Sequence, residues 1–246
     1  MKDSAILNQD ASLMTLTEVA TYLKVADKTV SRMLQRGEIP AVKVANQWRF
    51  SRARLDEWLM TGMRSAASDA LTEMRAESAV PRSLSRLIPD GCIVTGLTAE
   101  PKADLLARLT APLVGAGLVT DGNEFVRQLL AREAILPTAV GDGIALPHAR
   151  DPQAPAGRYG LAIGTSQTGI DFDAPDGRPV YIFVVLCADS VPHHLAMMVQ
   201  VALALREARV VRAVRDARAP CDVLAALIEH DQRRLFGNLA KITPEI

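Results

Sequence analysis

The chain contains few aromatic residues, few cysteines and no long apolar run. Aromatic residues make up 4% of its 246 positions, so the core must be built mainly from aliphatic side chains. The three cysteines, Cys92, Cys187 and Cys221, are widely spaced and form no zinc pattern or disulfide framework, which predicts buried free thiols. No stretch of about 18 uncharged apolar residues occurs, and the N-terminal residues lack the apolar segment of a signal peptide. We therefore expect a cytoplasmic protein without membrane insertion.

The net charge is zero, but the charged residues are unevenly distributed along the chain. The window 24–54 holds eight basic and two acidic residues, a local net charge of +6, so the remainder is net acidic. A basic segment in a neutral protein suggests that one part of the chain meets a polyanion. The apolar fraction of 49% allows a sizeable core, and the length suits one large domain or two smaller ones.

The stretch 13–61 begins with the pattern of two short helices. Thr15 or Thr17 can cap the first helix, and Asp27 can cap the second, which is expected at 28–35. The residues expected on the apolar faces of these helices are Val19, Ala20, Tyr22, Leu23, Val30, Met33 and Leu34.

The segment AVKVANQWRF, residues 41–50, alternates and then turns, which predicts a β-hairpin followed by a third helix. Trp48 and Phe50 are expected to pack this hairpin onto the third helix. Residues 13–61 therefore predict a small winged helix-turn-helix domain, mainly α-helical. The stretch LTEVATYLKVADKTVSRMLQRGEIPAVKVANQWRFSRARLDEWL resembles the excisionase type of the MerR-like superfamily, which implies DNA binding.

The second helix and the hairpin carry the candidate DNA contacts. The first turns of such a helix reach base edges in the major groove, and arginine in a wing can reach phosphates. The candidate residues are Lys28, Thr29, Ser31, Arg32, Lys43 and Arg49. The alternatives are a solvated basic face or a protein-interaction module. A single small module binds DNA weakly, so we expect a homodimer on paired half-sites.

Two segments lie outside the expected domains. Residues 1–12 are expected to be a flexible N-terminus, and residues 62–82 a helical linker rich in Ala, Ser, Arg and Glu. Ala67, Leu71 and Met74 recur three to four positions apart, so the linker is either a solvated spacer or a dimerising helix.

Residues 83–246 alternate between helical and strand patterns. DLLARLTAPLVGAGLV and NEFVRQLLAREAIL predict amphipathic helices, the second capped by Asp121 or Asn123. RYGLAIGTSQ and PVYIFVVLCAD are apolar runs of strand length, and HHLAMMVQVALALREA and PCDVLAALIEHD predict further helices. His230, in the last of these, is expected to be solvated. The pattern predicts an α/β sandwich with a mixed sheet.

The segment GIALPHAR, residues 143–150, places one of only four histidines directly after a proline. Its surroundings resemble the enzyme IIA family of the bacterial sugar phosphotransferase system, in the fructose/mannitol class that includes nitrogen-related regulatory members. The resemblance implies that His148 accepts a phosphoryl group and that His194 stabilises it, with His193 a candidate for the same role. The residues that the resemblance assigns to the phosphate pocket are Arg132, Glu133, Thr138, Gly143 and Pro147.

The chemistry of these residues agrees with that implication. An imidazole is a nucleophile near neutral pH, and phosphoryl transfer demands mainly positioning and charge stabilisation. The alternatives are a capped loop histidine at position 148, a surface or capping role for the His193–His194 pair, and a zinc site formed by all three. No Cys or carboxylate is placed to complete such a site, so no metal is expected.

The leading hypothesis is a cytoplasmic two-domain regulator. An HPr-like donor phosphorylates His148, and this state controls binding of DNA or of a regulated enzyme. The resemblance implies a phosphocarrier with a phosphohistidine intermediate rather than a stand-alone catalyst, and no cofactor beyond the covalent phosphate. One alternative is a carrier that passes phosphate to a sugar permease IIB component, with the front domain as a docking module. Another is a IIA-like domain that is never phosphorylated and binds a partner or small ligand.

Overall fold

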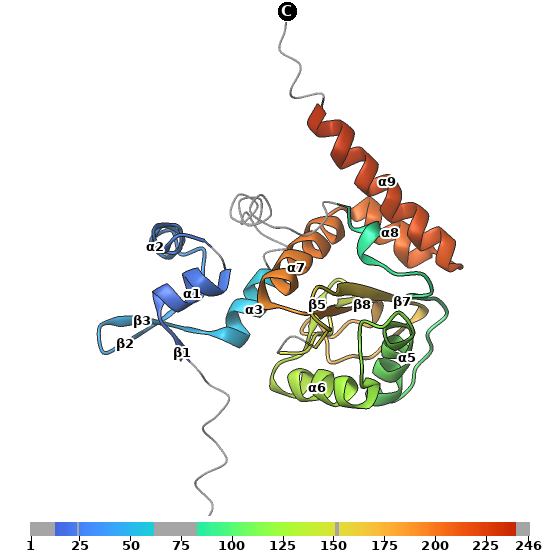
Figure 1. The fold of residues 1–246 in the computed structure, drawn as a ribbon, viewed down its shortest axis with the longest axis horizontal. Coiled ribbons are helices and arrows are strands. Elements are labelled where there is room, and N and C mark those ends of the chain that lie inside the picture. The colour runs from blue at the N-terminus through green and yellow to red at the C-terminus, as the bar shows by residue number, and fades with distance from the viewer. Residues whose placement is uncertain (1–12, 24, 62–82, 151–152, 240–246) are drawn as a thin grey trace, which may run out of the picture. The chain divides into compact units, whose positions relative to one another are not determined.

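The computed structural model describes residues 13–23, 25–61, 83–150 and 153–239 (Figure 1). The chain divides into two compact units, Met1–Glu77 and Ser78–Ile246. The expected flexible N-terminus at 1–12 and the expected helical linker at 62–82 lie outside the described residues.

The first unit is a helix-turn-helix region with a small sheet. Its elements are β1 (Leu13–Met14), α1 (Leu16–Leu23), α2 (Asp27–Gln35), β2 (Val42–Val44), β3 (Gln47–Ser51) and α3 (Arg52–Thr61). The sheet has the order β1-β3-β2, and both pairings are antiparallel. Ala45 and Asn46 have φ values of 46° and 64°, which fits the two-residue hairpin turn between β2 and β3.

A side chain caps the first helix of this unit but not the second. Thr15 Oγ1 accepts from the Glu18 N–H, and the Thr15 N–H donates to Glu18 Oε2, so Thr15 caps α1 in a reciprocal capping box. The prediction that Asp27 caps α2 is wrong: Asp27 is the first helical residue, Ala26 is the cap, and no side chain caps it. The Asp27 carboxylate instead accepts a hydrogen bond of 2.9 Å from Thr17 Oγ1, which links α1 to α2.

The core of the first unit contains most of the apolar positions expected from the sequence. Val19, Ala20, Tyr22, Leu23, Val30, Met33, Phe50 and Leu55 are all buried. Trp48 is 40% exposed, so the expectation that it packs the hairpin onto the third helix is wrong. It lies beside the hairpin turn, opposite Lys43, whereas Phe50 lies where β1 adds a third strand.

The second unit begins with a short 3₁₀ helix, η1, and alternates strands with helices. Its elements are η1 (Ser85–Leu87), β4 (Ile93–Val94), α5 (Lys102–Gly115), α6 (Gly122–Ile135), β5 (Ala139–Gly141), β6 (Ile144–Ala145), β7 (Tyr159–Ile170), β8 (Val180–Ala188), α7 (Val191–Leu205), α8 (Ala208–Asp216) and α9 (Pro220–Leu239). Asp121 caps α6 by accepting from the Glu124 N–H. Ser190 caps α7, and Pro192 lies in the first turn of that helix.

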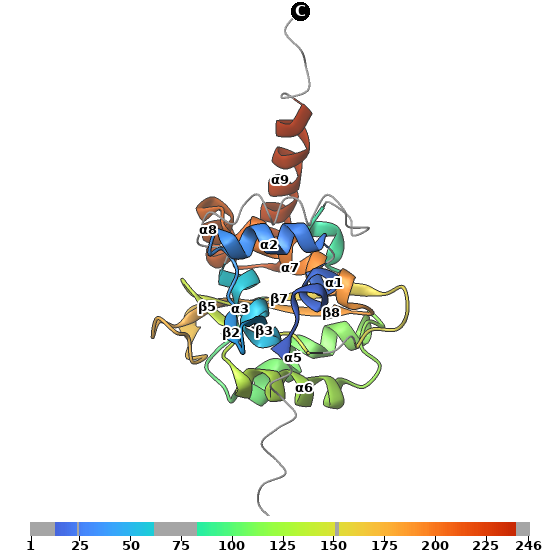
Figure 2. The same ribbon diagram turned by 90° about the vertical axis from the view of Figure 1, so that its left-hand side faces the viewer.

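The five strands form one mixed sheet in the order β4-β7-β8-β6-β5. The central pair β7 and β8 is antiparallel, whereas β4 pairs parallel to β7 and β6 pairs parallel to β8. Helices α5 and α6 cover one face of the sheet, and α7 and α8 cover the other (Figures 1 and 2). This arrangement confirms the predicted α/β sandwich with a mixed sheet.

Two minor expectations for the second unit are wrong. Cys92 and Cys187 are buried, and burial raises the pKa of their thiols to about 11 and about 12, but Cys221 is exposed. His230 is buried rather than solvated, and its Nδ1 lies 3.1 Å from Glu207 Oε1. Among the described residues, no helix combines the length and the apolar composition needed to cross a membrane.

Candidate phosphoryl-acceptor site

The segment after β6 delivers His148 to a fixed place beside the central strand β8. Ile144 and Ala145 pair parallel with Ile182 and Phe183 of β8. Past the end of β6, the Leu186 N–H donates to the Pro147 carbonyl at 3.2 Å, and His148 bridges to Leu186. The backbone around His148 is therefore held by pairing with a buried strand.

The hydrogen bond of the His148 ring determines which nitrogen is nucleophilic. His148 is 1% exposed, and its Nδ1 lies 2.8 Å from the carbonyl oxygen of Leu146. A carbonyl oxygen only accepts, so Nδ1 carries the proton in this contact. In the neutral imidazole the lone pair is then on Nε2, which is the atom able to attack phosphorus.

Helix α7 brings His194, rather than His193, next to His148. The His148 and His194 ring centroids are 5.2 Å apart, with an angle of 43° between the ring planes. Ser190 holds the first turn of α7, because its carbonyl accepts from the His194 N–H and its hydroxyl accepts from the His193 N–H. This separation is close enough for a phosphoryl group on His148 to accept a hydrogen bond from His194.

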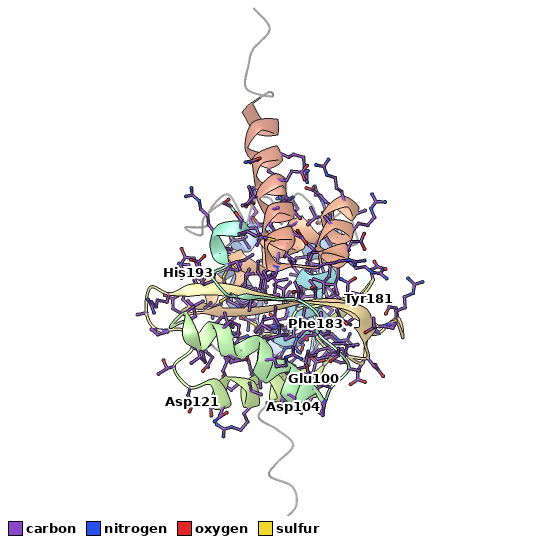
Figure 3. The ribbon with its side chains drawn as sticks, turned by 90° about the vertical axis from the view of Figure 1, so that its right-hand side faces the viewer. Glu100, Asp104, Asp121, Tyr181, Phe183 and His193 are labelled. Atoms are coloured by element: carbon purple, nitrogen blue, oxygen red, sulfur yellow. The ribbon has the colours of Figure 1, made fainter. Side chains whose placement is uncertain are left out.

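His193 belongs to a different cluster. Its Nδ1 lies 2.5 Å from Asp189 Oδ1, and its ring packs on Tyr159 at a centroid distance of 4.3 Å. Figure 3 shows His193 and Tyr181 toward opposite ends of the long central strands. Burial acts to raise the pKa of Asp189, but hydrogen bonds from His193 and from the Gly157 N–H outweigh it, so the pKa is lowered.

The end of α6 supports the segment that leads to the site. The Thr138 N–H and hydroxyl both donate to Glu133 Oε2, at 3.0 and 2.5 Å, and the Thr138 carbonyl accepts from the Leu146 N–H at 3.0 Å. Arg132 is buried, and its Nη1 donates to the Leu136 carbonyl at 2.7 Å. Glu133 and Thr138 therefore hold the backbone at Leu146, two residues before His148, and Arg132 adds a buried positive charge at the end of α6.

Gly143 begins the GIALPHAR segment in a conformation that favours glycine. Its φ is +77°, and its carbonyl accepts from the N–H groups of both Tyr181 and Ile182. An added Cβ would lie 2.7 Å from Tyr181 Cδ2. Gly143 therefore lets β6 start directly against β8.

Replacing Gly143 with alanine is expected to destabilise the second unit. The left-handed backbone and the contact with Tyr181 together cost about 2–4 kcal/mol in the free energy of unfolding. Gly157→Ala is the matched control, because Gly157 has a φ of +75° with nothing within 4 Å of an added Cβ. Urea denaturation of both variants measures the difference, and equal destabilisation would contradict the role of the Tyr181 contact.

The candidate DNA-binding residues of the first unit lie on α2 and the hairpin. On α2, Lys28 and Arg32 are exposed, Thr29 and Ser31 are half-buried, and Val30 and Met33 of the same helix face the core. Lys43 is exposed beside Trp48. Arg49 is half-buried and donates to Gln47 Oε1 and to the Trp48 carbonyl, so the hairpin itself holds its guanidinium.

Sequence reasoning missed three contacts in and near the site. The Leu146 carbonyl that holds His148 is a backbone group and leaves no signal in the sequence. Asp189 pairs with His193, and their spacing of four residues at a helix start was an available signal. Lys102 pairs with Glu133 at 3.4 Å, and nothing in its local pattern indicates this. Among the described residues, no three His, Cys, Asp or Glu side chains are arranged to hold a metal ion.

Comparison with known proteins yields matches for both units. Residues 86–230 match the family described as phosphoenolpyruvate-dependent sugar phosphotransferase system, EIIA 2, and residues 13–63 match a helix-turn-helix domain family. A nitrogen regulatory protein of Bradyrhizobium diazoefficiens is 34% identical over 149 residues, covering 58% of this chain and 94% of that protein. A fructose-specific EIIABC component of Bacillus subtilis is 23% identical over 153 residues, which are 61% of this chain but only 24% of that protein.

The fold of the second unit also occurs in solved structures. The nitrogen regulatory protein IIA-Ntr of Neisseria meningitidis aligns with a TM-score of 0.52 and 23% sequence identity, covering 58% of this chain and 97% of that one. A IIA domain structure from Streptococcus pyogenes aligns with the same TM-score and 21% identity, covering 61% of this chain and 96% of that one. These likenesses show the fold.

Proposed function

Because residues 86–230 make this chain a member of the phosphoenolpyruvate-dependent sugar phosphotransferase system EIIA 2 family, with a helix-turn-helix domain before them, we propose that it is a phosphorylation-responsive DNA-binding regulator. An HPr-like protein phosphorylates His148, and the phosphorylation state changes how the first unit binds DNA. This function places the protein in the cytoplasm, where its donor and its DNA would be found.

The observation that carries the phosphorylation proposal is the contact between His148 Nδ1 and the Leu146 carbonyl. It leaves the lone pair on Nε2, which attacks the phosphorus of a phosphohistidine on the donor. The P–N bond to the donor breaks as the P–Nε2 bond forms, and the electron pair of the broken bond returns to the donor imidazole. His194 and Arg132 stabilise the added negative charge, and no cofactor takes part.

The regulatory part of the proposal rests on the combination of domains. A carrier of phosphate alone has no need of a helix-turn-helix domain with exposed basic residues on α2. One relative, of which the match covers 94%, is named a nitrogen regulatory protein. A phosphoryl group adds about −1.5 to −2 charges, which is enough to change a binding surface at or near the site.

A second candidate is a phosphocarrier that passes its phosphate to a IIB component, with the first unit as a docking module. The observation in its favour is the similarity to the PTS system fructose-specific EIIABC component, whose name joins an EIIA part to a B part in one protein. The two candidates differ in whether phosphorylation changes DNA binding.

The test incubates the full chain with enzyme I, HPr and labelled phosphoenolpyruvate. We expect acid-labile label in the peptide that contains His148. DNA selected from a random-sequence library is then titrated with the phosphorylated and the unphosphorylated chain. Different dissociation constants support the regulator, equal constants with onward transfer to a IIB component support the carrier, and absence of label refutes both.

Replacing Arg32 with alanine is expected to weaken DNA binding by about 10- to 100-fold, because an exposed arginine on α2 can reach a base edge or a phosphate. Arg36→Ala is the control, because Arg36 is the residue that caps the C-terminal end of α2 and lies 3.8 Å from Glu38. Fluorescence anisotropy at several salt concentrations measures both variants. Equal affinity of the two variants would contradict the assignment of α2 as the recognition helix.

A further inference from the structure

Lys102 connects three elements of the second unit. It is the first residue of α5, and its Nζ lies 3.4 Å from Glu133 Oε1 on α6. The same Nζ lies 2.7 Å from Asp173 Oδ2 and 4.4 Å from the centre of the Phe172 ring, both on the connection between β7 and β8. Glu100 and Asp104, labelled in Figure 3, flank this position along the chain.

A continuous series of contacts runs from Lys102 to the ring of His148. Lys102 pairs with one carboxylate oxygen of Glu133, and Thr138 donates through its N–H and its hydroxyl to the other. The Thr138 carbonyl accepts from the Leu146 N–H, and the Leu146 carbonyl accepts from His148 Nδ1. The last of these contacts fixes the tautomer of His148.

The electrostatics of Glu133 make Lys102 important for this series. The Glu133 side chain is 5% exposed, and within the described part of the chain Lys102 is the cation that pairs with it. A buried carboxylate without its cation is strongly disfavoured, so it turns toward other donors or toward water. With Lys102 on one oxygen and Thr138 on the other, Glu133 has a single favourable orientation.

We propose that Lys102 is a positioning residue for phosphoryl transfer to His148. It holds Glu133, which holds Thr138, which places the Leu146 carbonyl where it orders the imidazole of His148. Lys102 also ties this series to the Asp173 segment, so the β7–β8 connection and the end of α6 keep one relative arrangement. The transfer step in this proposal rests on the proposed function, whereas the effect on the hydrogen bond of His148 does not.

The kinetic test compares Lys102→Met, Lys102→Gln and Lys102→Arg in the full chain. The kcat for phosphoryl transfer from phosphorylated HPr is expected to fall about 10- to 100-fold in the Met and Gln variants, because misplacement of a reacting group mainly lowers kcat. The KM for the donor stays within about threefold, because donor contacts are unchanged. Lys102→Arg keeps the cation and is expected to stay within about threefold of the wild-type kcat.

The matched control is Arg108→Met. Arg108 lies on the same helix and pairs with Glu100 at 3.0 Å, outside the series that leads to His148. Its kcat is expected to equal that of the wild-type chain. If Lys102→Met does not fold, the kcat of Lys102→Gln tests the proposal, since the glutamine side chain removes the charge but keeps a hydrogen-bond donor.

A second readout requires no phosphoryl donor. In ¹⁵N NMR spectra, the wild-type chain and Lys102→Arg are expected to show His148 with a protonated Nδ1 and an unprotonated Nε2. Lys102→Gln is expected to show averaged shifts of the two tautomers. A folded Lys102→Gln variant with the wild-type tautomer and wild-type kcat would overturn the proposal. A wild-type chain that takes no label refutes the proposed function. The tautomer of His148 in the Lys102 variants still tests whether Lys102 positions the His148 ring.

Discussion

Replacing His148 with glutamine is expected to abolish labelling of this chain by phosphorylated HPr, a loss of more than about 1000-fold. In the proposed transfer the P–N bond forms at Nε2, and an amide nitrogen does not replace an imidazole as the nucleophile. Glutamine suits the buried position, because its amide can still donate a hydrogen bond to the Leu146 carbonyl. The variant is therefore expected to keep its fold, which a thermal melt checks.

The other histidines provide the controls for this experiment. His230→Gln changes a buried histidine that pairs with Glu207, and its labelling is expected to equal that of the wild-type chain. His193→Gln removes the partner of Asp189 and is expected to retain most labelling, since His194 is the neighbour of His148. Full labelling of His148→Gln would contradict the assignment of His148 as the acceptor. If labelling were then lost in the double variant His148→Gln/His193→Gln, the acceptor would be His193.

The elements with strong periodic patterns could be predicted from the sequence. The buried side chains of α1 are those expected from the sequence, Val19, Ala20, Tyr22 and Leu23. Apolar residues at helical spacing lie on one side of a helix, and that side packs against the core. The runs that form β7 and β8 are apolar on both faces and lie in the centre of the sheet, covered by helices on each side. The spacing of apolar residues indicates which side chains are buried, and this was sufficient to predict α1, β7 and β8.

Residues near the limits of an element were harder to place, because tertiary neighbours decide their environment. Trp48 and Phe50 have the same strand parity, but only Phe50 lies where a third strand completes the sheet. His230 and Cys221 both belong to α9, yet one is buried beside Glu207 and the other is exposed. No local pattern distinguishes these cases.

In the candidate site, too, some features could be predicted from the sequence and others depended on the fold. The residue types and their order indicated His148, but helical geometry had to separate His193 from His194. Consecutive helix residues are turned by about 100°, so one ring faces His148 and the other faces Asp189 and Tyr159. The contacts that order His148 pass through backbone groups of Thr138 and Leu146, which any residue could provide.

Replacing Arg132 with glutamine is expected to slow phosphoryl transfer to His148 by about 100- to 1000-fold, the loss typical of one charged or hydrogen-bonding group that stabilises a transition state. Arg132 is 4% exposed, and its Nη1 donates to the Leu136 carbonyl. Within the described residues, no carboxylate pairs with this guanidinium, and its Nε has no hydrogen-bond partner. A buried cation without an anion is costly, which suits a site that receives a phosphoryl dianion.

The same reasoning predicts opposite effects on activity and stability. Removing an uncompensated buried charge is expected to leave the melting temperature unchanged or to raise it, while transfer is lost. Inorganic phosphate is expected to raise the melting temperature of the wild-type chain but not that of Arg132→Gln, because a ligand stabilises only the state that binds it. Arg127→Gln, on the same helix, removes an exposed arginine that pairs with Glu124 and should match the wild-type chain in both measurements. If Arg132→Gln transfers phosphate at the wild-type rate, the buried charge of Arg132 serves the fold and not the transfer. The negative charge of the phosphoryl group would then have to be stabilised by His194 and backbone N–H groups alone.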